Sequence, residues 1–257
     1  MKIAVSESSK RFISRFFGPR FHQKLRKIYL AWDVPRRGRP SEVECRVVED
    51  LIQPGDSVAD LGANIGLYSF LFSQLVGPTG RVYSCEPLGE NLAILESVIR
   101  KAKLSNVTLL PCAVGSRPGQ QTMVIPRGGD SGGYYLAHFQ EVGDSGDSRM
   151  VDVVTLDQLW ESGRVPHLDF LKCDVEGAEA EALKGGRKMI EALLPGFLME
   201  VIRRTSEEVF AFFSELGYYA FVYDGRLVRT KFYRDKEFSN YFFLHPQSKL
   251  GRRALDI

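Results

Sequence analysis

The stretch DLGANIG at residues 60–66 connects two apolar segments of the chain. The short strand-like run SVADL (57–61) leads into it, and the helix-like run LYSFLFSQLV (67–76) follows it. Glycine-rich turns between a strand and a helix are typical of sites where backbone lies close to a ligand. Dinucleotides, nucleoside triphosphates and S-adenosylmethionine are all bound at such turns, so the details of this turn must decide between them.

Three features of the turn separate these ligands. A nucleoside triphosphate loop needs Lys followed by Ser or Thr after its last glycine, whereas residues 67–68 are Leu-Tyr, which excludes that class. The dinucleotide fingerprint G-x-G-x-x-G is not met, because Gly62, Asn64 and Gly66 give G-x-N-x-G. Asp60 at the strand end would repel a pyrophosphate and attract an ammonium or sulfonium group. The turn therefore predicts a cationic ligand that carries an amino-acid group.

Apolar strand-like runs alternate with helical patterns through the rest of the chain. Runs that are apolar on both faces and are separated by helices predict a parallel sheet covered on both sides. We therefore predict an α/β fold with a doubly wound, mostly parallel sheet and an antiparallel strand pair at its C-terminal end. Strands are expected at 57–61, 81–86, 107–114, 168–174 and 197–202, the antiparallel pair at 218–225 and 240–246, and helices at 41–52, 65–75, 88–103, 178–193 and 206–216.

The four cysteines, Cys45, Cys85, Cys112 and Cys173, are far apart and include no C-x-x-C pair. This pattern excludes a ribbon-type zinc site and argues against a disulfide framework, so we expect buried thiols in a reducing compartment. The sequence contains no run of about 18 apolar residues, and its first ten residues lack the apolar region of a secretory signal. We therefore expect a cytoplasmic protein.

Positive charge is concentrated at the N-terminus. Residues 1–40 carry eleven Lys/Arg and two acidic residues, a net charge of +9, whereas the whole chain of 257 residues carries +2. We predict a basic arm over 1–40, ending in the hinge PRRGRP (35–40), and a main domain over 41–257. Within the arm, residues 21–32 form a candidate amphipathic helix with Phe21, Leu25, Ile28 and Trp32 on one face.

Three roles are open for this basic segment, residues 10–32. It can pack on the main domain with its charges in water, contact nucleic acid, or lie on an anionic membrane at its inner face. A second irregular segment, residues 115–150, is rich in Gly, Ser and Asp and is too long for a simple connection. We expect it to be either a flap over the site, with His138 as a candidate base, or a surface loop.

Polar residues stand at the carboxyl ends of the predicted parallel strands, where open α/β sheets bind ligands. Glu86 ends the second strand 20 residues beyond Gly66. A doubly wound fold places an acid there to accept hydrogen bonds from both ribose hydroxyls. The turn, Glu86 and a third-strand end at Ala113 together fit S-adenosylmethionine, with Ala113 and its neighbours lining the adenine.

The motifs in this order resemble the FkbM-type methyltransferases. The segments that carry the resemblance are DLGANIG, Glu86-Pro87, NVTLLPCAVG (106–115), VTLDQL (154–159) and, as the most specific part, DFLKCDVEGAE (169–179). The resemblance covers roughly residues 42–245. It implies a Rossmann-like class I methyltransferase fold, S-adenosylmethionine as cofactor, and O-methylation of a hydroxyl on a sugar, a glycan or a small natural product.

By position, the resemblance also implies roles for individual residues. Asp174 would lie beside the reactive methyl group, where such enzymes contact the methionine amino group or the substrate. Family members often have an acid-x-His pair at the end of the fifth strand, but this chain has Glu200 followed by Val-Ile. The residues implied to line the cofactor are Asp60, Gly62, Asn64, Gly66, Glu86, Ala113 and Asp174.

Methyl transfer to an alcohol benefits from a base within hydrogen-bond reach, because a hydroxyl is a weak nucleophile. Asp174, Glu176 and Glu200 all stand at strand ends and are the candidate catalytic residues. Three carboxylates can also hold a divalent cation, but we favour direct base or orienting roles and predict no metal site. Glu179 is expected to be structural, at the positive end of the next helix.

Two other functions remain open from the sequence. The missing histidine after Glu200 is also compatible with a binding or scaffold protein that keeps the fold without turnover. Nucleic-acid methylation is disfavoured, because residues 173–176 are Cys-Asp-Val-Glu where such enzymes carry a DPPY-type or NPPF-type motif. The expected partner is therefore a small-molecule or glycan acceptor.

Overall fold

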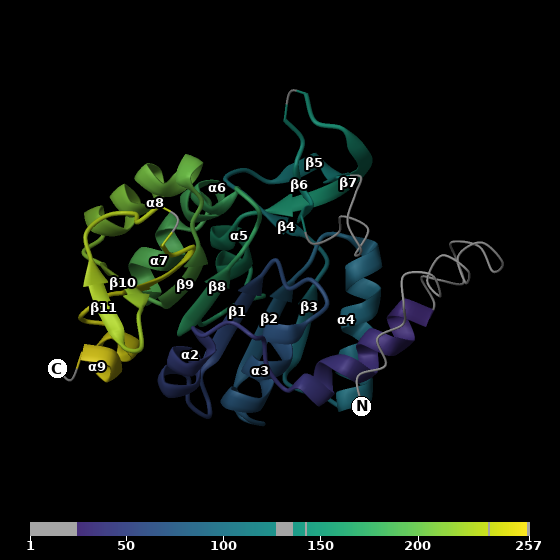
Figure 1. Cartoon of the computed structure of the whole chain (residues 1–257), viewed down its shortest axis with the longest axis horizontal. Coiled ribbons are helices and arrows are strands. Elements are labelled where there is room, and N and C mark those ends of the chain that lie inside the picture. The colour runs from purple at the N-terminus through teal and green to yellow at the C-terminus, as the bar shows by residue number, and fades with distance from the viewer. Residues whose placement is uncertain (1–24, 127–135, 142, 236, 256–257) are drawn as a thin grey trace.

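The computed structural model describes residues 25–126, 136–141, 143–235 and 237–255, which form a layered α/β structure (Figure 1). Its large sheet has eight strands in the order β11-β10-β12-β9-β8-β1-β2-β3. Strands β9, β8, β1, β2 and β3 are parallel, and β12, β10 and β11 are antiparallel to their neighbours. The strands are β1 (Ser57–Leu61), β2 (Arg81–Cys85), β3 (Val107–Leu110), β8 (Phe170–Cys173), β9 (Gly196–Glu200), β10 (Tyr219–Tyr223), β11 (Leu227–Thr230) and β12 (Asn240–Leu244).

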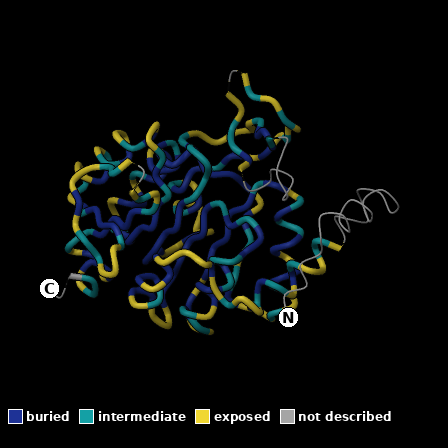
Figure 2. Tube along the Cα trace, in the orientation of Figure 1, coloured by how far each residue is buried: buried dark blue, intermediate teal, exposed yellow. Residues whose placement is uncertain are grey.

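Helices cover both faces of this sheet, so the predicted doubly wound α/β fold is confirmed. The strands are mostly buried, and exposed residues lie mainly on the helices and loops around them (Figure 2). Helices α5 to α8 pack on one face, and α2, α3 and α9 pack on the other. The helices are α2 (Cys45–Leu51), α3 (Leu67–Val76), α4 (Gly89–Ala102), α5 (Leu156–Glu161), α6 (Glu179–Lys184), α7 (Arg187–Leu193), α8 (Arg203–Glu215) and α9 (Lys249–Leu255).

The antiparallel C-terminal pair is confirmed as β10 and β12. Strand β12 also pairs with β9, so it lies between β9 and β10 in the sheet. Its side chains alternate between the two cores, with Tyr241 and Phe243 on one face and Phe242 and Leu244 on the other. Strand β11 extends the sheet edge beyond β10 and was not predicted from the sequence.

A second, smaller sheet occupies the region where a flap or a surface loop was expected. It contains β4 (Ala113–Val114), β5 (Gly119–Pro126), β6 (His138–Phe139) and β7 (Gly146–Val154), in the order β4-β7-β5-β6. The predicted strand at 107–114 is therefore two strands, β3 and β4, in different sheets. The chain leaves the large sheet at Pro111, which lacks an N–H group for the ladder. For the described residues, the surface-loop alternative is wrong.

Two predicted helices differ from the structure for local reasons. The helix expected at 178–193 is divided into α6 and α7 at Gly185 and Gly186. A Cβ on Gly185 would lie 2.1 Å from the carbonyl oxygen of Gly115, so the close passage of another segment requires glycine there. The helix expected from Ser41 begins instead at Cys45, with Glu44 as an N-cap that makes no side-chain capping bond.

A further helix is described over residues 25–37 and packs beside α4. It continues through Pro35, where the sequence predicted a hinge, and Gly38 follows it with a φ of +74°. Arg39 then forms an ion pair with Glu49. Among the described residues, no helix is long and apolar enough to cross a membrane. Residues 1–24 lie outside the described part of the chain.

The aromatic cluster between α8 and the antiparallel strands generates a stability prediction. Phe213 is fully buried, stacks on Phe243 with ring centroids 4.0 Å apart, and meets the edge of Phe197 at 4.8 Å. We expect Phe213→Ala to lower the free energy of unfolding by about 3–5 kcal/mol in urea titrations, because it removes a large side chain from a packed core. The control Phe232→Ala truncates an exposed ring and should change it by less than about 0.5 kcal/mol. Equal effects of the two changes would contradict this account.

Candidate active site

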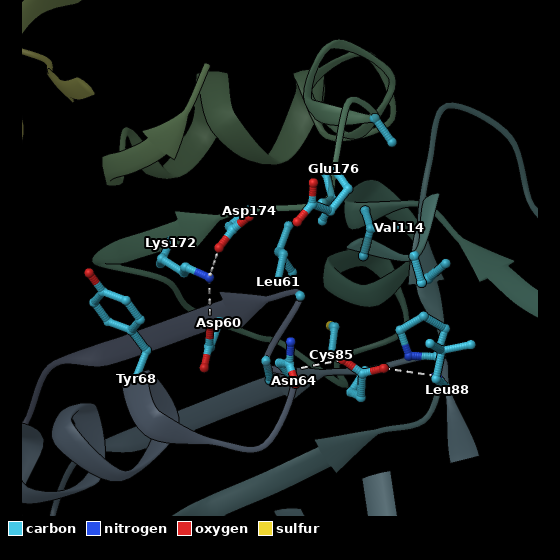
Figure 3. Close-up of a pocket in the computed structure, with 18 of the residues that line it drawn as sticks. Asp60, Leu61, Asn64, Tyr68, Cys85, Leu88, Val114, Lys172, Asp174 and Glu176 are labelled. Carbon is cyan, nitrogen blue, oxygen red and sulfur yellow. Dashed lines mark hydrogen bonds and ion pairs between the residues drawn. The ribbon is translucent and has the colours of Figure 1, made fainter. Parts of the chain in front are cut away.

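A cavity of about 270 Å³ lies at the carboxyl ends of the parallel strands, in the position expected for this sheet type (Figure 3). Residues from the ends of β1, β2, β8 and β9 meet there, together with the small sheet. Gly66 does not line the cavity; its φ of +90° turns the chain into α3. The sequence-predicted residues that do line it are Asp60, Gly62, Asn64, Glu86, Ala113, Asp174, Glu176 and Glu200.

Glu86 is buried at the end of β2 and is held by backbone amides. One carboxylate oxygen accepts a hydrogen bond from the amide of Asn64 at 2.8 Å, and the other accepts one from the amide of Leu88 at 2.9 Å. Burial raises the pKa of Glu86 to about 7 in spite of these bonds. The Asn91 side chain also hydrogen-bonds to this carboxyl, and the remaining lone pairs of the two oxygens can accept further hydrogen bonds. Glu86 therefore presents a fixed pair of acceptors to a ligand diol.

Asp60 is completely buried at the end of β1. Its Oδ2 accepts a hydrogen bond from Ser69 Oγ at 2.6 Å, whereas its Oδ1 has no hydrogen-bond partner among the described residues. Burial raises the pKa of this carboxyl, although Lys172 and Ser69 oppose the rise. The side-chain oxygen of Asn64 is likewise buried without a partner in the described part of the chain. Both atoms are hydrogen-bond acceptors, so this wall of the cavity suits a ligand that donates.

Lys172 is a central site residue that the sequence reasoning missed. Its ammonium is buried between two carboxylates, 3.0 Å from Asp174 Oδ2 and 3.8 Å from Asp60 Oδ1 (Figure 3). It also lies 5.1 Å from the centre of the Tyr68 ring. Burial lowers the pKa of Lys172, but the two carboxylates outweigh burial and hold the pKa above its usual value. The available signal was a lysine within the apolar run of β8, two positions before Asp174 and so on the same strand face.

At Gly62, the turn after β1 lies against the turn after β8. It has a φ of +74°, and a Cβ at this position would lie 1.9 Å from the backbone oxygen of Asp174. Any side chain would therefore push the two turns apart. This glycine is required by the contact between DLGANIG and the DVEGAE turn, in addition to its place in the cavity wall. The sequence had predicted close approach to a ligand only.

The sequence comparison agrees with this arrangement. A model of the methyltransferase FkbM domain matches residues 60–219, which include every strand end described above. The chain belongs to the FkbM methyltransferase family. A solved FkbM methyltransferase from Methylobacillus flagellatus KT shares the fold, with a TM-score of 0.50 and 17% identity. The match covers 86% of this chain and 59% of that one, so this chain spans about three fifths of that protein's length.

Two other solved methyltransferases are similar to this FkbM family member. One is a putative methyltransferase from Streptococcus mutans in complex with SAH, with a TM-score of 0.46, 12% identity, and coverage of 80% of this chain and 96% of that one. The other is a SAM-dependent O-methyltransferase from Thermotoga maritima, with a TM-score of 0.44, 16% identity, and coverage of 83% and 69% respectively.

The cavity of this FkbM family member fits the cofactor that the family implies. S-adenosylmethionine carries an ammonium, a sulfonium and two ribose hydroxyls, and the cavity offers acceptor atoms of Asp60, Asn64 and Glu86. The wall also contains apolar side chains, among them Ala113 and Met123 from the small sheet. Donor groups on the ligand thus match acceptor atoms on the protein, of which Asp60 Oδ1 and Asn64 Oδ1 have no hydrogen-bond partner among the described residues.

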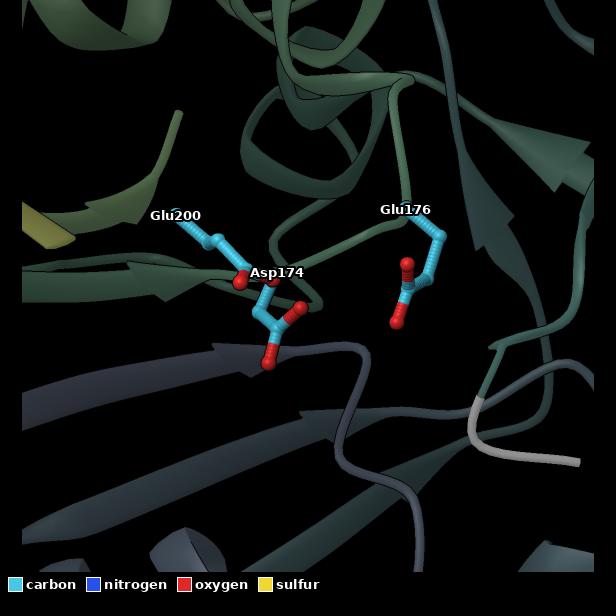
Figure 4. Close-up of side chains that lie close together, drawn as sticks. All are labelled: Asp174, Glu176 and Glu200. Atoms are coloured by element: carbon cyan, nitrogen blue, oxygen red, sulfur yellow. The ribbon is translucent and has the colours of Figure 1, made fainter. Parts of the chain in front are cut away.

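Three carboxyl groups gather on the other side of the cavity (Figure 4). One oxygen each of Asp174, Glu176 and Glu200 lies within 4.8 Å of the others. Burial and the charge of Asp174 raise the pKa of Glu176 to about 7.

Glu179, which was expected to be structural, is buried at the start of α6 and accepts a hydrogen bond from the Gly177 amide at 2.9 Å.

The pKa values of Asp174 and Glu200 are shifted in opposite directions. Burial raises the pKa of Asp174, but the Lys172 ammonium and a hydrogen bond from Glu200 outweigh it, so this pKa lies below its usual value. Burial and the neighbouring Asp174 carboxylate raise the pKa of Glu200 to about 8. At neutral pH, Asp174 is therefore ionised, and Glu200 keeps the proton that the two carboxyls share.

The small sheet forms a further wall of the cavity. Met123, Leu136 and Phe139 line it, and an ion pair between Glu141 and Arg204 connects this sheet to α8. His138 does not line the cavity, because its ring nitrogens bond to the Leu136 carbonyl and to Asp144. The tyrosines at 134–135 lie outside the described residues. The segment is thus a wall of the site, and its histidine is bonded within its own loop.

The buried position of Lys172 predicts a pH-dependent stability defect. In Lys172→Met, Asp60 and Asp174 lose their cation, so their pKa values in the folded protein rise. A carboxyl whose folded-state pKa exceeds its unfolded value of about 4 loses stability as the pH rises through that range. We expect urea titrations to show a loss of about 3–5 kcal/mol near pH 8 and a smaller loss near pH 5.

The matched control for this prediction is Lys188→Met, which removes an exposed ion pair with Glu161. It should change the free energy of unfolding by less than about 1 kcal/mol at either pH. The same loss at both pH values in Lys172→Met would show that packing, and not the ammonium charge, explains its effect.

Proposed function

We propose that this FkbM methyltransferase transfers a methyl group from S-adenosylmethionine to a hydroxyl oxygen of a sugar, a glycan or a small natural product. The observation that carries the proposal is the position of the Asp174 and Glu200 carboxyls, which have oxygens within 4.8 Å of one another in the cavity, with the buried Lys172 ammonium 3.0 Å from Asp174. A cavity wall rich in acceptors lies across from this pair. The site thus offers a cofactor position and an ionised base within one cavity.

The proposed cofactor contacts follow from the acceptor atoms in the cavity wall. Glu86 binds the ribose hydroxyls, and Asp60 with Asn64 faces the amino-acid end. Ala113 and Met123 pack against the adenine. When bound, S-adenosylmethionine supplies a methyl group on a positively charged sulfur.

Asp174 is the proposed general base. An alcohol hydroxyl reacts poorly until its proton is withdrawn, and a carboxylate within hydrogen-bond reach can accept that proton. Lys172 keeps Asp174 ionised, and Glu200, which keeps its proton, hydrogen-bonds to it. The pair therefore takes the place of the acid-x-His histidine that this chain lacks. Orientation of the hydroxyl by the same groups contributes further, because the reaction is an in-line displacement.

We assign the three carboxyls to proton transfer and orientation, without a divalent cation. The Lys172 ammonium already supplies positive charge 3.0 Å from Asp174, where a cation would compete with it. A proton between Asp174 and Glu200 also occupies lone pairs that metal binding requires. The ammonium and the shared proton both belong to side chains of this protein.

The cofactor assignment is tested by calorimetry with S-adenosylmethionine and its demethylated product. In Glu86→Gln, the amide nitrogen can accept no hydrogen bond from the Asn64 or Leu88 amides, so the acceptor pair is lost. We expect affinity to fall by roughly 10- to 100-fold, as for the loss of a hydrogen bond to a charged group. Glu96→Gln, an exposed change on α4, should bind like the wild type. No binding by the wild-type protein would refute the assignment.

The base assignment is tested by transfer of a tritiated methyl group to a small-molecule extract. Asp174→Asn should lower the transfer rate by roughly 10²- to 10³-fold, because an amide accepts no proton. Glu200→Gln should keep most of the rate at neutral pH, because a neutral amide resembles the protonated acid. In the wild type the rate should change near a pH of about 8, where Glu200 loses its proton, and this change should be absent in Glu200→Gln.

Two further experiments decide between this mechanism and its alternatives. A chelator should leave the rate unchanged, and loss of activity that Mg²⁺ restores would assign the carboxyls to a cation instead. Cofactor binding without transfer to any acceptor would favour a binding protein. Mass spectrometry of the labelled product should find a methyl ether, and a methylated amine would refute transfer to oxygen.

A further inference from the structure

The helix at residues 25–37 carries two apolar stripes on opposite sides. The inner stripe, with Leu30, Ala31 and Val34, packs against Ile94 and Val98 of α4 and their neighbours. Ala31 and Val34 are almost completely buried. The helix is therefore fixed to the body of the protein by a stripe other than the one that the sequence analysis singled out.

The second stripe faces away from the protein. Leu25, Ile28, Tyr29 and Trp32 are spaced i, i+3, i+4 and i+7, which places them on one side of the helix. Their exposed fractions are 40%, 46%, 58% and 61%. We call these four residues the outer face. Exposed apolar side chains grouped in this way mark an interaction surface.

Positive charge surrounds the outer face. Arg36 is exposed one turn beyond Trp32 on the same side of the helix. Lys101 of α4 places its ammonium 3.8 Å from the centre of the Trp32 ring. The sequence that contains the helix, residues 1–40, carries a net charge of +9. A partner that matches the outer face must therefore carry negative charge on its own surface and have an apolar layer beneath that charge.

We propose that the outer face binds the surface of an anionic lipid membrane. Trp and Tyr rings favour the headgroup level, aliphatic side chains enter the acyl boundary, and Lys and Arg attract anionic lipids. Leu25 and Ile28 make up half of the face, and neither can stack on bases as a nucleic-acid surface requires. Lipid fits all four side chains and the charge around them.

The position of this helix also determines how the active site would lie relative to the membrane. The inner stripe holds the outer face in place before binding, so little ordering cost accompanies docking. Pro40 and Glu42, a few residues after the helix, line the active-site cavity. Docking would therefore bring the cavity edge toward the lipid surface, where an acceptor carried on a lipid is accessible. Membrane binding itself does not depend on the proposed methyl transfer.

Flotation of the full chain with vesicles tests the proposal. The probe is phosphatidylcholine vesicles that contain about one third phosphatidylglycerol, compared with phosphatidylcholine alone. We expect binding to the anionic vesicles, weakened by salt, and at least about a tenfold lower partition coefficient in Ile28→Glu/Trp32→Glu. The matched control Met150→Glu/Phe232→Glu adds the same charge at apolar residues that are 64% and 66% exposed elsewhere, and should bind like the wild type.

Fluorescence gives an independent readout of insertion. The chain has two tryptophans, so Trp160→Phe leaves Trp32 as the only tryptophan, which can be excited selectively at wavelengths that tyrosine does not absorb. Its emission should shift to shorter wavelength with anionic vesicles and remain unchanged with RNA. Calorimetry with the demethylated cofactor should give equal affinities for the wild type and both double variants, which separates this test from that of the proposed function.

Three results would overturn the proposal. These are equal vesicle binding by Ile28→Glu/Trp32→Glu and the wild type, an emission shift with RNA alone, and a dimer in sedimentation that this variant abolishes. The last result would assign the outer face to a second copy of the chain.

Discussion

The ammonium of Lys172 is the charge on which the strand ends of β1 and β8 depend. It lies between two carboxylates from the ends of neighbouring strands, of which Asp60 is completely buried and Asp174 is partly exposed. Without a cation in this place, Asp60 and Asp174 would repel one another in a region of low dielectric constant. With it, one carboxylate forms part of the cavity wall and the other remains ionised at neutral pH. The ammonium therefore supports both the architecture of the site and its proposed proton chemistry.

The parts of the molecule that the sequence predicted well are those that depend on local pattern. Apolar runs of strand length, separated by helical patterns, determine a doubly wound sheet whatever their detailed packing. Residues at the ends of parallel strands then meet at one edge because of the topology alone. For this reason Glu86, Asp174 and Glu200 were placed in one cavity from the sequence, although nothing local indicated which of the carboxyls would hold a proton.

The features that the sequence did not predict depend on contacts between distant segments. The break between α6 and α7 exists because Gly115 passes over Gly185. The departure of β4 from the large sheet depends on its pairing with β7. The sequence analysis singled out one apolar stripe of the first described helix, whereas the stripe that packs against α4 is the one with Ala31 and Val34. In the same way, the role of Lys172 required knowledge that β8 lies next to β1.

The contact between Gly62 and Asp174 also bears on how the protein folds. The two turns are remote in the chain and meet only when β8 has inserted beside β1, a parallel pairing that closes a long loop and so forms slowly. The cavity is complete only when β8 is in place, because Lys172 and Asp174 line one side of it. A ligand of this cavity thus binds the completed sheet alone and shifts the folding equilibrium toward it by mass action. The supply of cofactor in the cell would then influence how much of the protein escapes degradation.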